Sequence, residues 1–141
     1  MARTPWLSEC VRSRLRIQND DKVFTPSDLL SLSRFTDFPV VYDVHHQRCL
    51  PDELSVDEAT CAAIDTWNRE PLFHISSPLA GWSGPRLAQH HDEVEINDFP
   101  ACWAGLALTV EVEAKGKEVA VRRLQDQFRW KFDGTSKTGL A

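Results

Sequence analysis

The sequence has no long apolar run, no closely spaced cysteine pair and no excess of positive charge, and each absence excludes a class of protein. No apolar stretch approaches the roughly 20 residues that a membrane-spanning helix needs, so we expect no membrane insertion. The four cysteines form no C-x-x-C pair and follow no signal peptide: Cys10, Cys49, Cys61 and Cys102. We therefore expect a reduced, intracellular chain, cytoplasmic in a bacterium or nuclear in a eukaryote.

The charge balance limits how the chain could bind nucleic acid. With 16 Lys and Arg against 21 Asp and Glu, the formal net charge is −5. This balance is unlike that of a protein that coats nucleic acid without specificity. A negative chain still binds a phosphodiester if bound cations neutralise the site, so the sign favours contact through metal ions over contact through lysines.

Four short apolar runs each end in a side chain that can bind a metal. They lie at residues 15–18, 39–42, 71–76 and 108–112, and stretches of helical character separate them. Strands that alternate with helices are typical of βα units, whose parallel strands bring their carboxyl ends to one face of an α/β barrel. The pattern predicts four parallel strands in sequence order, with the ligands gathered at one end.

Helix-capping residues support this alternation. Thr25-Pro26-Ser27-Asp28 is suited to start a helix, and Ser55-Val56-Asp57-Glu58 fits a capping box that opens a second helix to about Asn68. A short helix at about 99–105 and a last helix at about 117–128 follow. The expected buried face of the first helix is Leu29, Leu30, Leu32 and Phe35.

The length sets the extent of the fold. An eight-fold βα barrel takes roughly 250 residues, whereas 141 residues suffice for about four βα units. We therefore expect a single α/β domain over residues 1–141, a partial (β/α)8 TIM barrel, with residues 129–141 as a flexible tail. An open parallel sheet leaves two unpaired edges, so a missing amino-terminal half or self-association with a second copy should cover them.

Histidines and carboxylates from three segments form a candidate metal site. Asp43 and His46 make a D-x-x-H pair, His74 ends a strand, and His90-His91-Asp92 lies in a long irregular stretch at 77–91. A single histidine on an apolar run is more often a satisfied core residue, and His45 is the weakest candidate here. Taken together, the mixed nitrogen and oxygen ligands suit Mn²⁺, Zn²⁺ or Fe²⁺ better than Ca²⁺.

The last strand adds two alternating carboxylates, Glu111 and Glu113. Residues two apart on a strand face the same way, so both could point into a barrel, although a solvated strand end is the simpler alternative. Glu113 is the favoured ligand because it lies closer to the carboxyl end. Lys115 is a candidate partner for a phosphate or a carboxylate.

These ordered motifs resemble the carboxyl-terminal half of the UV damage endonucleases, barrel enzymes of the xylose-isomerase-like group. The resemblance covers about residues 15–124 and rests on five segments: I-Q-N-D-D at 17–21, Y-D-V-H-H at 42–46, F-H-I-S-S at 73–77, H-H-D at 90–92 and V-E-A-K-G-K-E at 112–118. It implies a cluster of divalent metal ions, commonly Mn²⁺, that serves to incise damaged DNA on the 5′ side of a photolesion.

The resemblance also implies residue roles. The metal ligands would be Asp43, His46, His74, His90 and Glu113, with Gln18 as a sixth. The predicted catalytic residues are His74, Glu113 and Lys115. Two positions depart from the family pattern: Gln18 stands where relatives usually place a ligand glutamate, and Leu72 stands where many have a lysine. An amide keeps one oxygen donor but loses the negative charge, so metal affinity should fall.

Three points stay open from the sequence. Asp92 could orient His90 or His91, or could bind a metal directly. The chain could instead be a sugar isomerase or another metal-dependent enzyme of the xylose-isomerase-like group. It could also be a catalytically dead barrel remnant that binds DNA or a protein, because half of the barrel and one ligand are absent.

Overall fold

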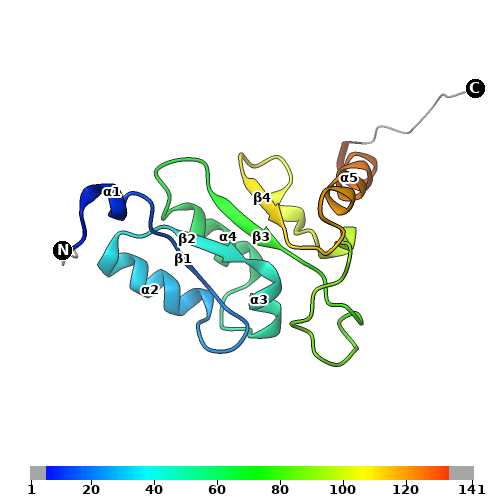
Figure 1. The fold of residues 1–141 in the computed structure, drawn as a ribbon, viewed down its shortest axis with the longest axis horizontal. Coiled ribbons are helices and arrows are strands. Elements are labelled where there is room, and N and C mark those ends of the chain that lie inside the picture. Colours follow the sequence, from blue (N-terminus) through cyan, green and yellow to red (C-terminus); the bar gives the residue numbers. More distant parts are fainter. Residues whose placement is uncertain (1–5, 134–141) are drawn as a thin grey trace, which may run out of the picture.

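The centre of the structure, a computed structural model that describes residues 6–133, is a four-stranded sheet (Figure 1). All pairs are parallel, and the order β1-β2-β3-β4 follows the sequence. The strands are β1 Ile17–Gln18, β2 Val40–Asp43, β3 Leu72–Ile75 and β4 Thr109–Val112. The prediction of four parallel strands in sequence order is therefore confirmed.

Helices connect and cover the strands. They are α1 Glu9–Arg12, α2 Pro26–Thr36, α3 Val44–Cys49, α4 Val56–Ile64 and α5 Lys117–Phe128. A 3-10 turn at Ala101–Trp103 lies within the short helix expected at about 99–105, and another at Ile96–Asp98 precedes it. A π-helical turn, Arg129–Asp133, continues α5. Of the tail expected at residues 129–141, the part from 134 onward lies outside the described residues.

The two expected capping boxes start α2 and α4. Thr25 and Asp28 exchange side-chain and backbone hydrogen bonds at the start of α2, and Ser55 and Glu58 do the same for α4. Because these bonds satisfy amides that the first helical turn leaves unpaired, the sequence determines where both helices begin.

The buried face of α2 differs from the expected one. Pro26, Leu29 and Ser33 are buried, whereas Leu32 and Phe35 are exposed, and Phe35 keeps 69% of its surface accessible. Leu29 and Ser33 lie four residues apart on the buried stripe of α2, and Leu32 and Phe35 fall to one side of that stripe. The prediction that these two side chains are buried is wrong.

Aromatic side chains fill the core beneath β2 and β3. Tyr42 and Phe73 are fully buried and meet edge to face with ring centroids 5.4 Å apart, and Trp103 packs on both. The indole N–H of Trp103 donates to Thr60 Oγ1 of α4 at 2.8 Å, so its polar atom is satisfied. This packing fixes β2 and β3 against α4 and leaves the carboxyl ends of the strands free for other side chains.

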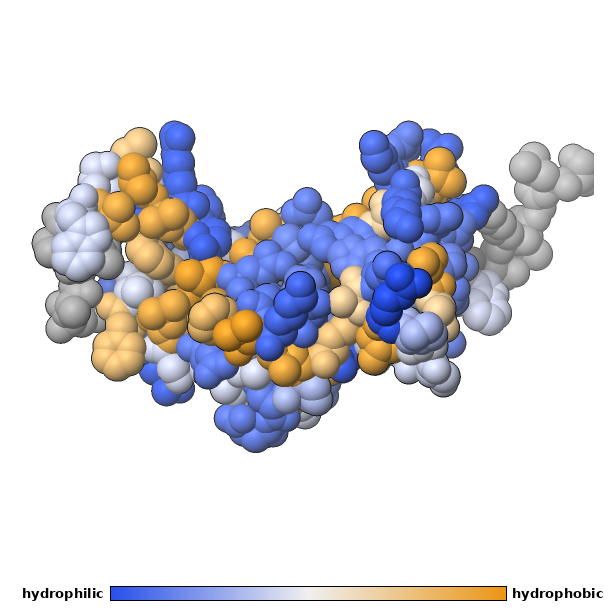
Figure 2. Space-filling model, turned by 60° about the horizontal axis from the view of Figure 1, so that its bottom comes forward, coloured by the Kyte–Doolittle hydropathy of each residue, from blue (hydrophilic) through white to orange (hydrophobic). Residues whose placement is uncertain are grey.

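The two outer strands, β1 and β4, each have one neighbour in the described sheet. Figure 2 shows hydrophobic residues interrupting the polar surface, among them at the end of the molecule that carries α1 and α2. Exposed apolar side chains there include Val11, Leu32 and Phe35. Within residues 6–133, no helix is both long and apolar enough to cross a membrane.

Candidate metal centre

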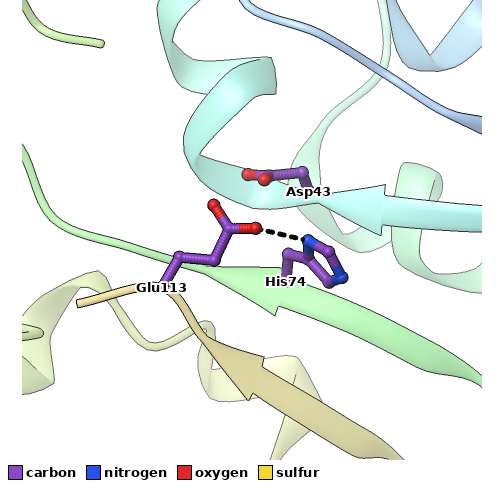
Figure 3. Close-up of side chains that lie close together, drawn as sticks. All are labelled: Asp43, His74 and Glu113. Atoms are coloured by element: carbon purple, nitrogen blue, oxygen red, sulfur yellow. Dashed lines mark ion pairs between the residues drawn. The ribbon is translucent and has the colours of Figure 1, made fainter. Parts of the chain in front are cut away.

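Asp43, His74 and Glu113 come together at the carboxyl ends of β2, β3 and β4 (Figure 3). One ligand atom from each lies within 4.8 Å of the others. The pairing of Asp43 with His74 across β2 and β3 sets two of them side by side, and the amide of Glu113 extends the ladder by donating to Ile75 O at 2.9 Å. Three neighbouring strands thus each deliver one ligand to the same edge of the sheet.

Asp43 is fully buried and also starts a helix. Its Oδ1 accepts a hydrogen bond from the backbone N–H of His46 at 3.0 Å and so caps α3, while its Oδ2 lies 3.3 Å from His46 Nδ1. This cap starts α3 directly at the end of β2 and so places His46 in the first turn of the helix.

Asn19 fixes the position of Asp43 and His46. The buried Asn19 side chain donates to Asp43 O and accepts from Asp43 N, both at 2.9 Å, and its own carbonyl oxygen lies 2.9 Å from His46 Nδ1. When Nδ1 carries the proton and donates to this carbonyl, the Nε2 lone pair of His46 is free to bind a cation. Asn19 was quoted only as part of a motif, and sequence reasoning missed this role.

Gln18 lies at the edge of the cluster. Its Nε2 is 3.3 Å from Asp43 Oδ2 and 3.2 Å from His74 Nδ1, so the amide contacts two of the three central residues. The side chain is exposed, on the outer strand β1. In this arrangement the amide nitrogen of Gln18 satisfies the Asp43 carboxylate.

His74 lies between two carboxylates. Its Nδ1 is 2.9 Å from Glu113 Oε1, and its Nε2 is 3.3 Å from Glu111 Oε2. Burial lowers the pKa of His74, but the hydrogen bond and charge of Glu113, followed by the charges of Asp43 and Glu111, outweigh burial and raise it. The hydrogen bond to His74 lowers the pKa of Glu113, and this effect is larger than the opposing effect of burial. The Glu113, Asp43 and Glu111 carboxylates thus favour the charged form of His74 in the absence of a metal.

Glu111, like Glu113, was expected either to point into the barrel or to lie on a solvated strand end, and Glu113 was the favoured ligand of the two. The period of two along β4 puts it on the same side as Glu113, as the alternation predicts, and its contact with His74 makes it part of the site. Glu111 is 60% exposed, so it connects His74 to solvent.

The long irregular stretch after β3 brings His90 to the cluster. Pro78 and His90 form an antiparallel bridge, and His90 Nδ1 lies 3.7 Å from Glu113 Oε2. Gly116 lets this stretch approach closely, since its N–H donates to Asp92 O at 2.8 Å and a Cβ on it would lie 2.5 Å from that oxygen. A larger residue at 116 would push the stretch that carries His90 away.

His45 has a structural environment. It is fully buried, and its two ring nitrogens face Ser76 O at 3.2 Å and Leu87 O at 2.8 Å. Burial lowers the pKa of His45, although these carbonyl groups oppose the shift. A neutral ring donates to only one of the two carbonyls. His45 thus attaches α3 to the long stretch, in line with its weak ranking as a ligand.

All six proposed ligands are therefore linked through contacts: Gln18, Asp43, His46, His74, His90 and Glu113. Lys115 and Asp92 are exposed and stand apart from this set. Their backbone groups hold the end of the long stretch in place: Lys115 N–H donates to His91 O, and Asp92 O accepts from Gly116 N–H. The predicted catalytic role of Lys115 and the two predicted roles of Asp92 stay predictions.

The fold and the site together define a class: part of an α/β barrel with carboxylates and imidazoles gathered at the carboxyl ends of its strands. The family model described as UV-endonuclease UvdE matches residues 2–139. The chain belongs to this family, which confirms the resemblance drawn from the motifs.

Several curated proteins share this similarity. The UV DNA damage endonuclease of Deinococcus radiodurans is 36% identical over 134 residues, which cover 92% of this chain and 43% of that protein. The protein of the same name from Halalkalibacterium halodurans is 34% identical over 130 residues, 86% of this chain and 39% of that protein. The chain thus spans about two fifths of the length of these relatives.

A solved structure supports the fold. The crystal structure of SacUVDE matches with a TM-score of 0.73 at 26% sequence identity, over 84% of this chain and 40% of that chain. Together with the four parallel strands in sequence order, this match confirms the prediction of a partial barrel.

Proposed function

We propose that this chain forms the metal-binding part of an active site that incises DNA on the 5′ side of UV photolesions. Membership of the UvdE family and the cluster of Asp43, His74 and Glu113 support this proposal. Relatives of this chain are named UV DNA damage endonucleases. Such an activity acts where the genome lies, in the cytoplasm of a bacterium or the nucleus of a eukaryote.

The side chains present fit a divalent transition metal. Two carboxylates and an imidazole offer ligand atoms within 4.8 Å of one another, and His46 and His90 add further nitrogens at the rim. Mixed oxygen and imidazole donors suit Mn²⁺, the ion we propose. When bound, divalent ions polarise a phosphoryl oxygen and lower the pKa of a bound water toward roughly 7.

The residues of this chain would orient these groups and move protons. Asn19 fixes the imidazole of His46, so its ring needs no reorganisation to bind. The carboxylates of Glu111 and Glu113 favour a proton on His74 in the metal-free chain, and the ring nitrogen that binds a cation must be free of its proton. The exposed Glu111 carboxylate, 3.3 Å from Nε2, is an acceptor through which that proton reaches solvent.

One observation favours a second candidate, a remnant without catalysis that binds DNA or a protein. The Gln18 amide satisfies Asp43 Oδ2 and contacts His74, so the cluster is internally paired without a cation. A glutamate at this position would instead place another negative charge beside Asp43 and require a cation. Metal binding therefore separates the two candidates.

Two measurements test the proposal. Calorimetric titration of the purified chain with Mn²⁺ should show saturable binding, and His74→Ala should abolish it. His91→Ala is the control and should retain binding, because His91 is next to His90 in the chain but lies outside the cluster. A fusion to the amino-terminal half of the Deinococcus radiodurans relative should nick UV-irradiated plasmid more than unirradiated plasmid. Equal nicking by the parent and the His74→Ala fusion would overturn the proposal and leave the remnant.

A further inference from the structure

A second polar hollow lies at the opposite end of the sheet from the cluster. It has a volume of about 750 Å³ and is bordered by Arg16, which precedes β1, by Pro39, which precedes β2, and by the ends of α1, α2 and α4. Since the cluster lies at the carboxyl ends of the strands and this hollow lies at their amino-terminal ends, the two are separate sites.

Four arginines line this hollow: Arg12, Arg16, Arg34 and Arg69. Among residues 6–133, the ion pairs of arginine involve only Arg123 and Arg129, so none of these four is paired with a described carboxylate. Arginine matches phosphate oxygens through parallel N–H donors.

Arg16 is held ready for such a ligand. Its guanidinium carbon lies 5.1 Å from the centroid of the Trp67 ring, and its Nη1 donates to Ser13 O at 3.1 Å and to Leu15 O at 2.5 Å. These contacts fix the side chain, so binding costs little further loss of side-chain freedom. The other N–H groups of Arg16 make no hydrogen bond to residues 6–133 and can donate to an anion.

The rest of the lining limits the kind of ligand. Glu9, Asp37 and Asp65 also border the hollow, which leaves one positive charge in excess. Recognition must therefore rest on directed guanidinium donors more than on the overall field. Phe38 and Pro39 provide apolar surface beside the arginines, and the volume lies in the range of small-molecule sites.

We infer that this hollow binds a small phosphate-bearing molecule through Arg16, Arg34 and their arginine neighbours. The inference does not depend on the proposed nuclease function, because the hollow shares no residue with the metal cluster.

Calorimetric titration of the full chain with inorganic pyrophosphate, in EDTA and about 0.15 M sodium chloride, tests the inference. EDTA keeps metal ions from carrying pyrophosphate to the cluster. We expect saturable binding of one pyrophosphate per chain, weakened about tenfold by Arg16→Gln and by Arg34→Gln because each removes a charge-assisted hydrogen bond. Arg122→Gln, which removes an exposed arginine from α5, should leave the affinity unchanged.

Binding that is absent at millimolar pyrophosphate, or unchanged in both hollow variants, would overturn the inference. So would equal weakening by Arg122→Gln, which would indicate a general attraction to positive charge. Circular dichroism of each variant checks folding. If Arg16→Gln unfolds, Arg34→Gln decides the result alone, because the side chain of Arg34 is exposed and makes no hydrogen bond or ion pair to residues 6–133.

Discussion

Replacing Gln18 by glutamate should weaken the metal-free chain and strengthen metal binding. The Gln18 amide nitrogen is 3.3 Å from Asp43 Oδ2, so a carboxylate there brings two negative charges together. At this distance the repulsion is about 1 kcal/mol in bulk water and about 5 kcal/mol at an effective dielectric constant of 20. Because Gln18 is exposed, we expect the lower end, a loss of about 1 kcal/mol in the free energy of unfolding.

A divalent cation reverses the sign of this effect. One added negative charge about 4 Å from a doubly charged ion gains about 2 kcal/mol in bulk water and more in a partly buried site. Mn²⁺ affinity should therefore rise by about tenfold or more.

Thermal unfolding with EDTA and with Mn²⁺ measures both effects on one protein. Gln18→Ala is the matched control, since it removes the amide contacts without adding charge and should weaken the metal-free chain without strengthening Mn²⁺ binding. Equal Mn²⁺ affinity of the parent and the Gln18→Glu chain would refute the assignment of Gln18 to a ligand position.

Three further predictions follow from other contacts. Asn19→Ala removes the partners that the Asn19 side chain gives to the buried backbone N–H and C=O of Asp43, and should lower the free energy of unfolding in urea by about 2–4 kcal/mol. A loss below about 0.5 kcal/mol would contradict the role of Asn19 in fixing Asp43. Because the pKa of His74 is raised, its imidazolium stabilises the metal-free chain fully below about pH 6.5, and this stabilisation is lost as pH rises through the raised pKa. Mn²⁺ affinity should increase over the same pH range, because the proton then no longer competes with the ion. Calorimetry that shows no change in Mn²⁺ affinity over this range would exclude His74 as a ligand. Light scattering should show concentration-dependent self-association that Phe35→Lys reduces and Val119→Lys, on α5, does not; a monomer at every concentration would contradict this.

The sequence predicted the sheet and the central cluster because both depend on local signals. Apolar runs ending in Asp43, His74 and Glu113 identify strand ends, and parallel strands align such ends. The capping boxes of α2 and α4 depend on residues three apart, so they too can be recognised in the sequence.

The features that sequence reasoning missed depend on distant contacts or on small shifts in phase. The role of Asn19 requires knowing that β1 lies beside β2, because its partners are more than 20 residues away. The exposure of Leu32 and Phe35 depends on which stripe of α2 packs on the sheet, and helical spacing alone did not distinguish the stripe of Leu29 and Ser33 from the one beside it. Helix α3 was missed because its cap, Asp43, was considered only as a ligand.

The double use of Asp43 affects how this family can drift in sequence. One carboxylate oxygen starts α3 and the other faces the cluster, so a replacement that cannot cap a helix disturbs the fold as well as the chemistry. Selection for folding alone would favour a capping residue such as Asp43, so its presence is weak evidence of catalysis. Gln18, exposed on an outer strand and in contact with the cluster only through its side-chain amide, is where a ligand can be lost at least cost to the fold. A chain that abandons nuclease activity would change there first.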